Sequence, residues 1–406
     1  MDKEIRKPTV HSMKRRSHSH DYRRCGYYHI TISVAKALRQ PLGRIAGRLD
    51  KPDGDCDAPH VELSAIGQMV EEELKCSIHQ HYPMLEVIEH IVMPEHLHFL
   101  LVVHKEIVSQ QGRPRHLGNV IAGFKYGCNM RYWTMTGMIN PEEAAGKDLT
   151  TESSGTRHSA KAGRGESVLG DSVAKKKLPP LFDAGYCDVM PIDEGQLAIQ
   201  LAYIRANPRS RLMRTINRLW LQPHRHIVNT AVSIPALKGY LQRECPRQLT
   251  TDGFALLTQR LLLDGGLITC DSYGNALLLR GRLLPVVCHR RDEGLFEQQK
   301  ARCLEESLSG AVLVSARIAK GEQEIWDAAL HSGHPVIRVE DNGFPDIYHP
   351  SADRMDDCAS GLLLLLTPWS YKFRTHDEGI KVPFCKTMNC VVQALCRTKD
   401  DWWKNV

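Results

Sequence analysis

Two histidines two positions apart, set in an apolar run, are the strongest indication of chemistry in the sequence. The run covers residues 93–103 (MPEHLHFLLVV) and contains His96 and His98. In a β-strand, side chains alternate between faces, so both imidazoles would point the same way. Two imidazoles on a rigid strand provide half of a metal site, although two ordinary polar residues at a strand end would give the same pattern. A second pair, His224 and His226, follows no clear strand, and we expect it at the surface or facing a bound partner.

A tyrosine with amide side chains at helical spacing follows about a hundred residues later. We expect a helix over residues 192–206 that Pro208 ends. Its apolar stripe consists of Leu197, Leu201 and Ile204. A different stripe carries Gln196, Gln200, Tyr203 and Asn207. This second stripe offers a phenol nucleophile and an amide oxygen. If two imidazoles and one amide oxygen bind an octahedral ion, positions stay open on that ion where a phosphate oxygen could bind. A tyrosine half-buried on an amphipathic helix is the alternative.

Together, the segments MPEHLHFLLVV and LAYIRANPRSR resemble the two signature segments of single-tyrosine HUH transposases. Among these they are most similar to the REP-associated tyrosine transposases (RAYTs). The resemblance covers roughly residues 22–230. It implies that His96 and His98 are the metal-binding HUH pair, that Tyr203 is the nucleophile, and that Asn207 is the amide ligand four residues later.

The activity implied by this resemblance is a Mg²⁺- or Mn²⁺-dependent endonuclease and strand transferase. It would act on single-stranded DNA with hairpins, such as REP-like sequences or transposon ends, in the bacterial cytoplasm at the nucleoid. Attack by tyrosine gives a 5′-phosphotyrosine link and a free 3′-OH. We expect a monomer or homodimer. The residues expected to contact DNA are Arg15, Arg16, Arg23, Arg24, Lys125, Arg131 and Arg205.

Three alternatives stay open from the residues alone. The chain could be a non-catalytic single-stranded nucleic-acid-binding protein derived from a transposase. A zinc hydrolase built on the histidine pair would need a carboxylate or cysteine ligand at suitable spacing, which the sequence lacks. Tyr126 and Tyr132 are other candidate nucleophiles, but neither has an amide four residues later.

The segments around the histidine pair alternate in the order of a small α+β sheet. We expect strands over residues 27–34, 85–92 and 96–103, because β-branched and aromatic residues are frequent there. The apolar period of residues 61–81 predicts a helix, and a basic, aromatic helix is expected over residues 118–132. The order β-α-β-β-α favours a ferredoxin-like sheet.

The C-terminal part predicts a second, smaller α/β domain over residues 240–406. Strands are expected over 311–318, 335–340 and 361–366, with a helix over 321–332. This pattern faintly resembles the Rossmann-like domain of DNA-processing protein A. Because the sequence has no glycine-rich phosphate-binding motif, it does not support a bound nucleotide, and we expect an accessory module.

Composition and charge are those expected of a globular protein that binds a polyanion. Of 406 residues, 42% are hydrophobic, and no apolar run is long enough to span a bilayer. The net charge is +6, and residues 1–230 hold the whole excess, with 32 Lys and Arg against 25 Asp and Glu. We expect a basic flexible arm over 1–24, a transposase-like domain over 25–230, and a disordered insertion over 140–177. The thirteen cysteines show no C-x-x-C pair, which favours free thiols.

Overall fold

The computed structural model describes residues 20–140, 178–191, 193–288, 293–373 and 381–404, and it combines helices with several sheets. The chain forms two compact units, which meet in sequence between Arg209 and Ser210. The expected insertion, apart from its first residue, and most of the expected N-terminal arm lie outside the described residues. No described helix is long and apolar enough to cross a membrane. All thirteen cysteines fall within the described part of the chain, and each is a free thiol.

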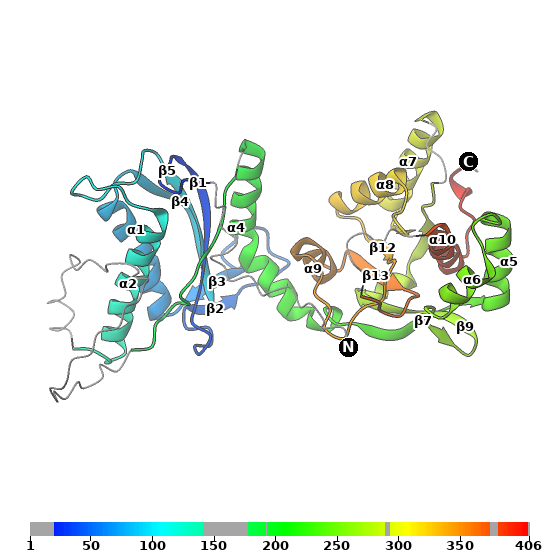
Figure 1. The fold of residues 1–406 in the computed structure, drawn as a ribbon, viewed down its shortest axis with the longest axis horizontal. Helices are drawn as coiled ribbons and strands as arrows, with labels where there is room; N and C mark the ends of the chain where they lie inside the picture. Colours follow the sequence, from blue (N-terminus) through cyan, green and yellow to red (C-terminus); the bar gives the residue numbers. More distant parts are fainter. Residues whose placement is uncertain (1–19, 141–177, 192, 289–292, 374–380, 405–406) are drawn as a thin grey trace, which may run out of the picture. The chain divides into compact units, whose positions relative to one another are not determined.

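The first unit is built on a four-stranded antiparallel sheet with the strand order β4-β5-β1-β6. Figure 1 shows α1 and α2 together on one side of this sheet and α4 on the other. A separate two-stranded sheet pairs β2 with β3. The elements are β1 (Gly26–Ser33), β2 (Gly43–Ala46), β3 (His60–Leu63), α1 (Ala65–His81), β4 (Leu85–Met93), β5 (His96–Val103), α2 (Leu117–Met135), β6 (Cys187–Val189) and α4 (Glu194–Ile216).

The core of the first unit lies between the sheet and the helices α1 and α2. Alternate residues of β5, among them Leu97 and Phe99, are fully buried in one cluster with Leu74 of α1 and Phe124 of α2. The ring of Phe99 lies 6.3 Å from that of Phe124 in an edge-on arrangement. This packing leaves the opposite residues of each strand, including the two histidines of β5, on the other face of the sheet.

Two helix boundaries lie four or more residues from those predicted. The helix expected to begin at residue 61 begins at Ala65, because Ser64 caps it by accepting a hydrogen bond from the Gly67 amide. The residues before the cap form β3 instead. The second difference is that Pro208 does not end α4, which continues to Ile216. Proline removes only one helical hydrogen bond, and Arg209 is anchored at once by the carbonyl oxygens of Leu49 and Lys51.

The second unit contains the expected α/β arrangement within a larger sheet. Strands β10, β11, β12 and β13 are parallel neighbours, and β9 and β7 extend the sheet in antiparallel pairing. One core holds α5, α6 and α10 against the sheet, and a second holds α7 and α8. Its elements are η2 (Arg218–Trp220), β7 (His224–Ser233), α5 (Ile234–Glu244), α6 (Thr251–Thr258), β8 (Leu263–Asp264), β9 (Leu267–Gly274), η3 (Ala276–Arg280), β10 (Arg282–Pro285), α7 (Glu293–Leu308), β11 (Ala311–Ser315), α8 (Lys320–His331), β12 (Val336–Val339), α9 (Ala352–Ala359), β13 (Leu363–Thr367), α10 (Val382–Cys396) and η4 (Trp402–Lys404).

The position of Phe99 predicts that the first unit depends strongly on this ring. Phe99→Ala should lower the free energy of unfolding by about 3–5 kcal/mol, because it removes buried apolar surface and leaves a cavity. Hydrogen exchange of the amides of β1 and β5 at increasing urea concentrations measures this change. Ile199→Ala is the control, since Ile199 is 63% exposed and its loss should cost less than about 0.5 kcal/mol. Equal losses in the two variants would contradict the assignment of the core.

Candidate active site

Both histidines of the predicted metal pair lie on the sheet face opposite α1 and α2. In the pairing of β1 with β5, His98 is opposite Thr31 and His96 is opposite Ser33. The imidazole rings of His96 and His98 are 4.7 Å apart and edge-on to each other. The structure therefore brings the pair together on one face, as strand alternation predicts.

A third histidine, His29 of β1, joins this pair. Its Nε2 lies 3.1 Å from Nδ1 of His98, and the Oγ1 of Thr31 lies 2.9 Å from the same His98 nitrogen. His29 and His98 are only 4% and 5% exposed. The sequence analysis missed His29. The signal available was its place in the strand YYHITISV, where it and Thr31 alternate with Tyr28 and Ile30 of the core.

Burial keeps these imidazoles neutral. Desolvation lowers the pKa of His98 to about 3, with smaller contributions from the neighbouring His96 and His29. Desolvation also lowers the pKa of His29, against a smaller opposing effect of its hydrogen bond to Gln200. Only the neutral form has a lone pair for a metal ion, so at pH 7 the ring of His98 is in the state able to bind metal.

Helix α4 places the predicted nucleophile beside the histidines. The ring of Tyr203 is edge-on to that of His98 with 5.4 Å between centroids, and it lies 5.8 Å from the ring of His29. Tyr203 is 45% exposed, so its phenol is accessible from solvent. Gln200, one turn earlier, contacts Nδ1 of His29 through Oε1.

Asn207, the predicted third metal ligand, is held by its own helix. Its amide nitrogen donates a hydrogen bond of 2.7 Å to the carbonyl oxygen of Tyr203. This contact uses the donor end of the amide and leaves the oxygen Oδ1 as the atom able to bind a cation. An amide of α4 that does contact a histidine is that of Gln200, which lies against His29.

Two arginines attach α4 to the rest of the first unit. The Nε of Arg205 lies 2.6 Å from a carboxylate oxygen of Glu89 on β4. Arg209 forms an ion pair of 2.8 Å with Asp53, in addition to its bonds to backbone carbonyl oxygens. Ile204 between them is fully buried. These contacts fix the helix that carries Tyr203 over the sheet.

The arginines predicted to contact DNA are paired with acids where the structure describes them. Arg23 and Arg24 both pair with Asp21, at 2.9 and 3.6 Å, and Arg131 on α2 pairs with Glu72 at 2.7 Å. Arg205 is 68% exposed despite its contact with Glu89. Arg15 and Arg16 lie outside the described residues.

Lys125 does not fit the predicted DNA-binding role. Its side chain is buried, and its ammonium group donates to backbone carbonyl oxygens of the loop before β6, including those of Asp183 and Gly185. A buried ammonium needs such partners, because desolvating an unpaired charge is costly. Lys125 therefore holds this loop against α2.

The other candidate nucleophiles lie on α2, which covers the opposite face of the sheet. Tyr132 is buried in the core of the first unit, and Tyr126 is 40% exposed. The second histidine pair belongs to the second unit, where it lies within β7 and not outside a strand as predicted. The ring of His224 there contacts the carbonyl oxygen of Leu219.

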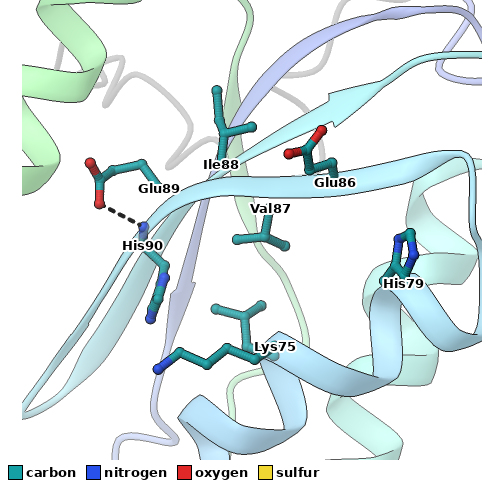
Figure 2. A pocket seen from close by; sticks show the side chains of 8 residues that line it. Lys75, His79, Glu86, Val87, Ile88, Glu89 and His90 are labelled. Carbon is teal, nitrogen blue, oxygen red and sulfur yellow. Dashed lines mark hydrogen bonds between the residues drawn. The ribbon is translucent and has the colours of Figure 1, made fainter.

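A cavity of about 460 Å³ in the first unit is lined by other residues than His29, His96 and His98. Figure 2 shows that it is lined by α1 and β4, with Lys75 and His79 from the helix and Val87 and His90 from the strand. Its charged groups are engaged locally, since Glu71 pairs with Lys75 and with His90. The face that carries His29, His96 and His98 is a more complete chemical site, because it joins imidazoles of a kind that can bind a metal to an accessible phenol.

Comparisons with known proteins leave the family open. No protein-family model matches the chain, and no curated protein matches it. One similar solved structure is DNA processing protein A from Helicobacter pylori, described for its single-stranded DNA binding mode, with 20% sequence identity and a TM-score of 0.25. The match covers 33% of this chain and spans 59% of the length of that chain. Function is therefore inferred from the geometry of the site.

The contacts of Lys125 predict a structural role that can be separated from DNA binding. Lys125→Met keeps the length of the side chain but leaves carbonyl oxygens without a donor, which should lower the free energy of unfolding by about 1–3 kcal/mol. Urea denaturation measures this loss. Lys75→Met is the control, because the Lys75 side chain is 54% exposed. A normally stable Lys125→Met protein that binds single-stranded DNA weakly would contradict the structural role.

Proposed function

We propose that this protein is a metal-dependent single-stranded DNA endonuclease and strand transferase that acts through a 5′-phosphotyrosine intermediate. The observation that carries the proposal is the contact between His98 and Tyr203, which are far apart in the sequence. A pair of histidines and a tyrosine on one accessible face combine a metal site with a nucleophile. The proposed substrate is hairpin-containing DNA in the bacterial cytoplasm.

The topology of the first unit supports a ferredoxin-like transposase domain. Its main sheet runs β1-α1-β4-β5-α2-β6 along the chain, with the spatial order β4-β5-β1-β6. This is the β-α-β-β-α-β sequence of the ferredoxin-like arrangement. The histidines lie on its central strands, and the tyrosine helix covers the face that α1 and α2 leave open. In the second unit, parallel strands with helices on both faces support a Rossmann-like accessory domain.

The donor set fits a divalent ion. His96 and His98 offer imidazole nitrogens, that of His98 neutral because desolvation lowers its pKa, and Asn207 offers the amide oxygen that its helix leaves unused. Nitrogen and oxygen donors of this kind suit Mn²⁺ or Mg²⁺. Such an ion, when bound, would withdraw charge from the non-bridging oxygens of a phosphodiester.

The chain's own groups account for the bond changes. The phenol oxygen of Tyr203 attacks phosphorus, a phosphotyrosine bond forms, and the bond from phosphorus to the 3′ oxygen breaks. The proton lost by the phenol is balanced by the proton taken up at the new 3′-OH. Because one phosphodiester replaces another, the reverse attack by a 3′-OH can rejoin the strand. The exposed side of Tyr203 gives a single strand access to this oxygen.

Tyr203→Phe should abolish both cleavage and the covalent protein–DNA adduct, because it removes the attacking oxygen and keeps the ring. The measurement is a denaturing gel after incubation with hairpin-bearing single-stranded DNA and Mn²⁺, with peptide mapping of the adduct. Tyr126→Phe is the matched control, since Tyr126 is similarly exposed on α2, and it should retain the adduct. An adduct that persists in Tyr203→Phe would exclude this nucleophile. If no strand tested forms an adduct with the wild-type protein, the non-catalytic binder is favoured.

His96→Ala should lose Mn²⁺-dependent cleavage by at least about 100-fold while DNA binding changes little, because it removes a metal ligand from a partly exposed position. Cleavage rates over a range of Mn²⁺ concentrations and an electrophoretic binding assay separate the two effects. His104→Ala is the control, since His104 is exposed beyond the end of β5 and pairs with Glu86. Full activity of His96→Ala in the presence of a chelator would rule out the metal site.

A further inference from the structure

We propose that Gln200 and His29 are positioning residues that fix the imidazole of His98 with its proton on Nδ1 and its lone pair on Nε2. The proposal rests on the proposed function only for its consequence, which is that His98 faces a metal ion through Nε2. The arrangement of protons along Gln200, His29 and His98 is a property of the protein without metal or DNA.

The direction of this hydrogen-bond chain follows from the atom that begins it. Oε1 of Gln200 is a carbonyl oxygen and can only accept, so Nδ1 of His29 carries the proton that it receives. A neutral imidazole has one N–H, and therefore Nε2 of His29 is an acceptor. That nitrogen lies 3.1 Å from Nδ1 of His98, which must then be the donor.

The hydroxyl of Thr31 is compatible with the same arrangement, because its oxygen can accept from Nδ1 of His98. This oxygen, Oγ1, lies 2.9 Å from Nδ1 of His98. A proton on this nitrogen therefore has two acceptors within reach on β1, Oγ1 of Thr31 and Nε2 of His29. Shared hydrogen bonds of this kind are common. With Nδ1 protonated, the lone pair of His98 is on Nε2, the nitrogen farther from the backbone.

Both nitrogens of His29 are occupied, which separates its role from that of a metal ligand. Nδ1 donates to Gln200 and Nε2 accepts from His98, so no lone pair remains for an ion. Metal-binding histidines commonly donate their other ring N–H to an acceptor that sets the ring's orientation and tautomer. Here that acceptor is another histidine.

The chain of hydrogen bonds also connects the helix of the nucleophile to the strand of the metal pair. Gln200 precedes Tyr203 by three residues, so the two side chains lie on neighbouring positions of one face of α4. Through His29, the contact of Gln200 sets where Tyr203 lies relative to His98. Loss of either member should therefore disturb the metal site without removing a ligand.

The first test reads the tautomer directly, in the full-length, metal-free protein without DNA. Nitrogen NMR of ¹⁵N-histidine-labelled protein at pH 7.5 distinguishes protonated from unprotonated ring nitrogens, and His98→Asn identifies the signals of His98. We expect the proton on Nδ1 in the wild type. In His29→Phe and in Gln200→Leu, a substantial population should move to Nε2–H. Gln200→Glu keeps an acceptor oxygen and should keep the wild-type tautomer, as should the control Ile199→Ala, which changes the preceding residue of α4, whose side chain is 63% exposed.

The second test measures Mn²⁺ affinity, by electron paramagnetic resonance of the free ion. His29→Phe and Gln200→Leu should each weaken binding about 10–100-fold, and Ile199→Ala should not. A wild-type His98 protonated on Nε2, or a tautomer unchanged in both His29→Phe and Gln200→Leu, would overturn the proposal. If the tautomer is as expected but no covalent adduct forms with DNA, the positioning role stands and the transposase function fails. If a covalent adduct forms but the tautomer is not as expected, the role of Tyr203 as nucleophile stands and the positioning role of Gln200 and His29 fails.

Discussion

The first unit depends on one constraint, the two-residue alternation of β5. One set of its side chains, including Leu97 and Phe99, packs against α1 and α2, and the other set carries His96 and His98. A slip of one residue against β1 would exchange the two sets, placing imidazoles in the core and a phenyl ring on the open face. The packing that stabilises the sheet therefore also determines where the chemistry lies.

Helix α4 converts this polar face into a site. It buries Ile204, holds β4 through Arg205 and Glu89, and touches β1 through Gln200. His29 and His98 are buried on this face, and desolvation lowers the pKa of each imidazole. A single helix thus carries the proposed nucleophile and the amide that contacts His29, while Tyr203 stays 45% exposed.

The features readable from the sequence are those that depend on local period and spacing. Strand alternation predicts the shared face of His96 and His98, and most strands and helices of the first unit lie close to their expected limits. Alternation places His29 on the same face as Thr31, but its position beside His98 depends on the register of β1 against β5, which the sequence does not show. The predicted end of α4 was wrong for a similar reason, because contacts of Arg209 with a loop distant in the sequence outweigh the effect of Pro208. Strand β7 was not predicted from the sequence. Its pairing with β9 is irregular and the backbone has positive φ at His226 and Ala231, so its side chains do not alternate with a period of two.

The pairing of surface arginines with acids changes what the basic balance of the chain means for DNA. Arg23, Arg131 and Arg205 each already have a carboxylate partner. A phosphate that binds one of them must displace a fixed anion of the protein instead of mobile ions alone, and the entropy gained from released counterions is then smaller. Affinity for a strand would thus rest more on the shape of the site and on base stacking than the count of positive charges suggests. Such a surface would discriminate between strands better than an unpaired basic patch, because nonspecific attraction contributes less.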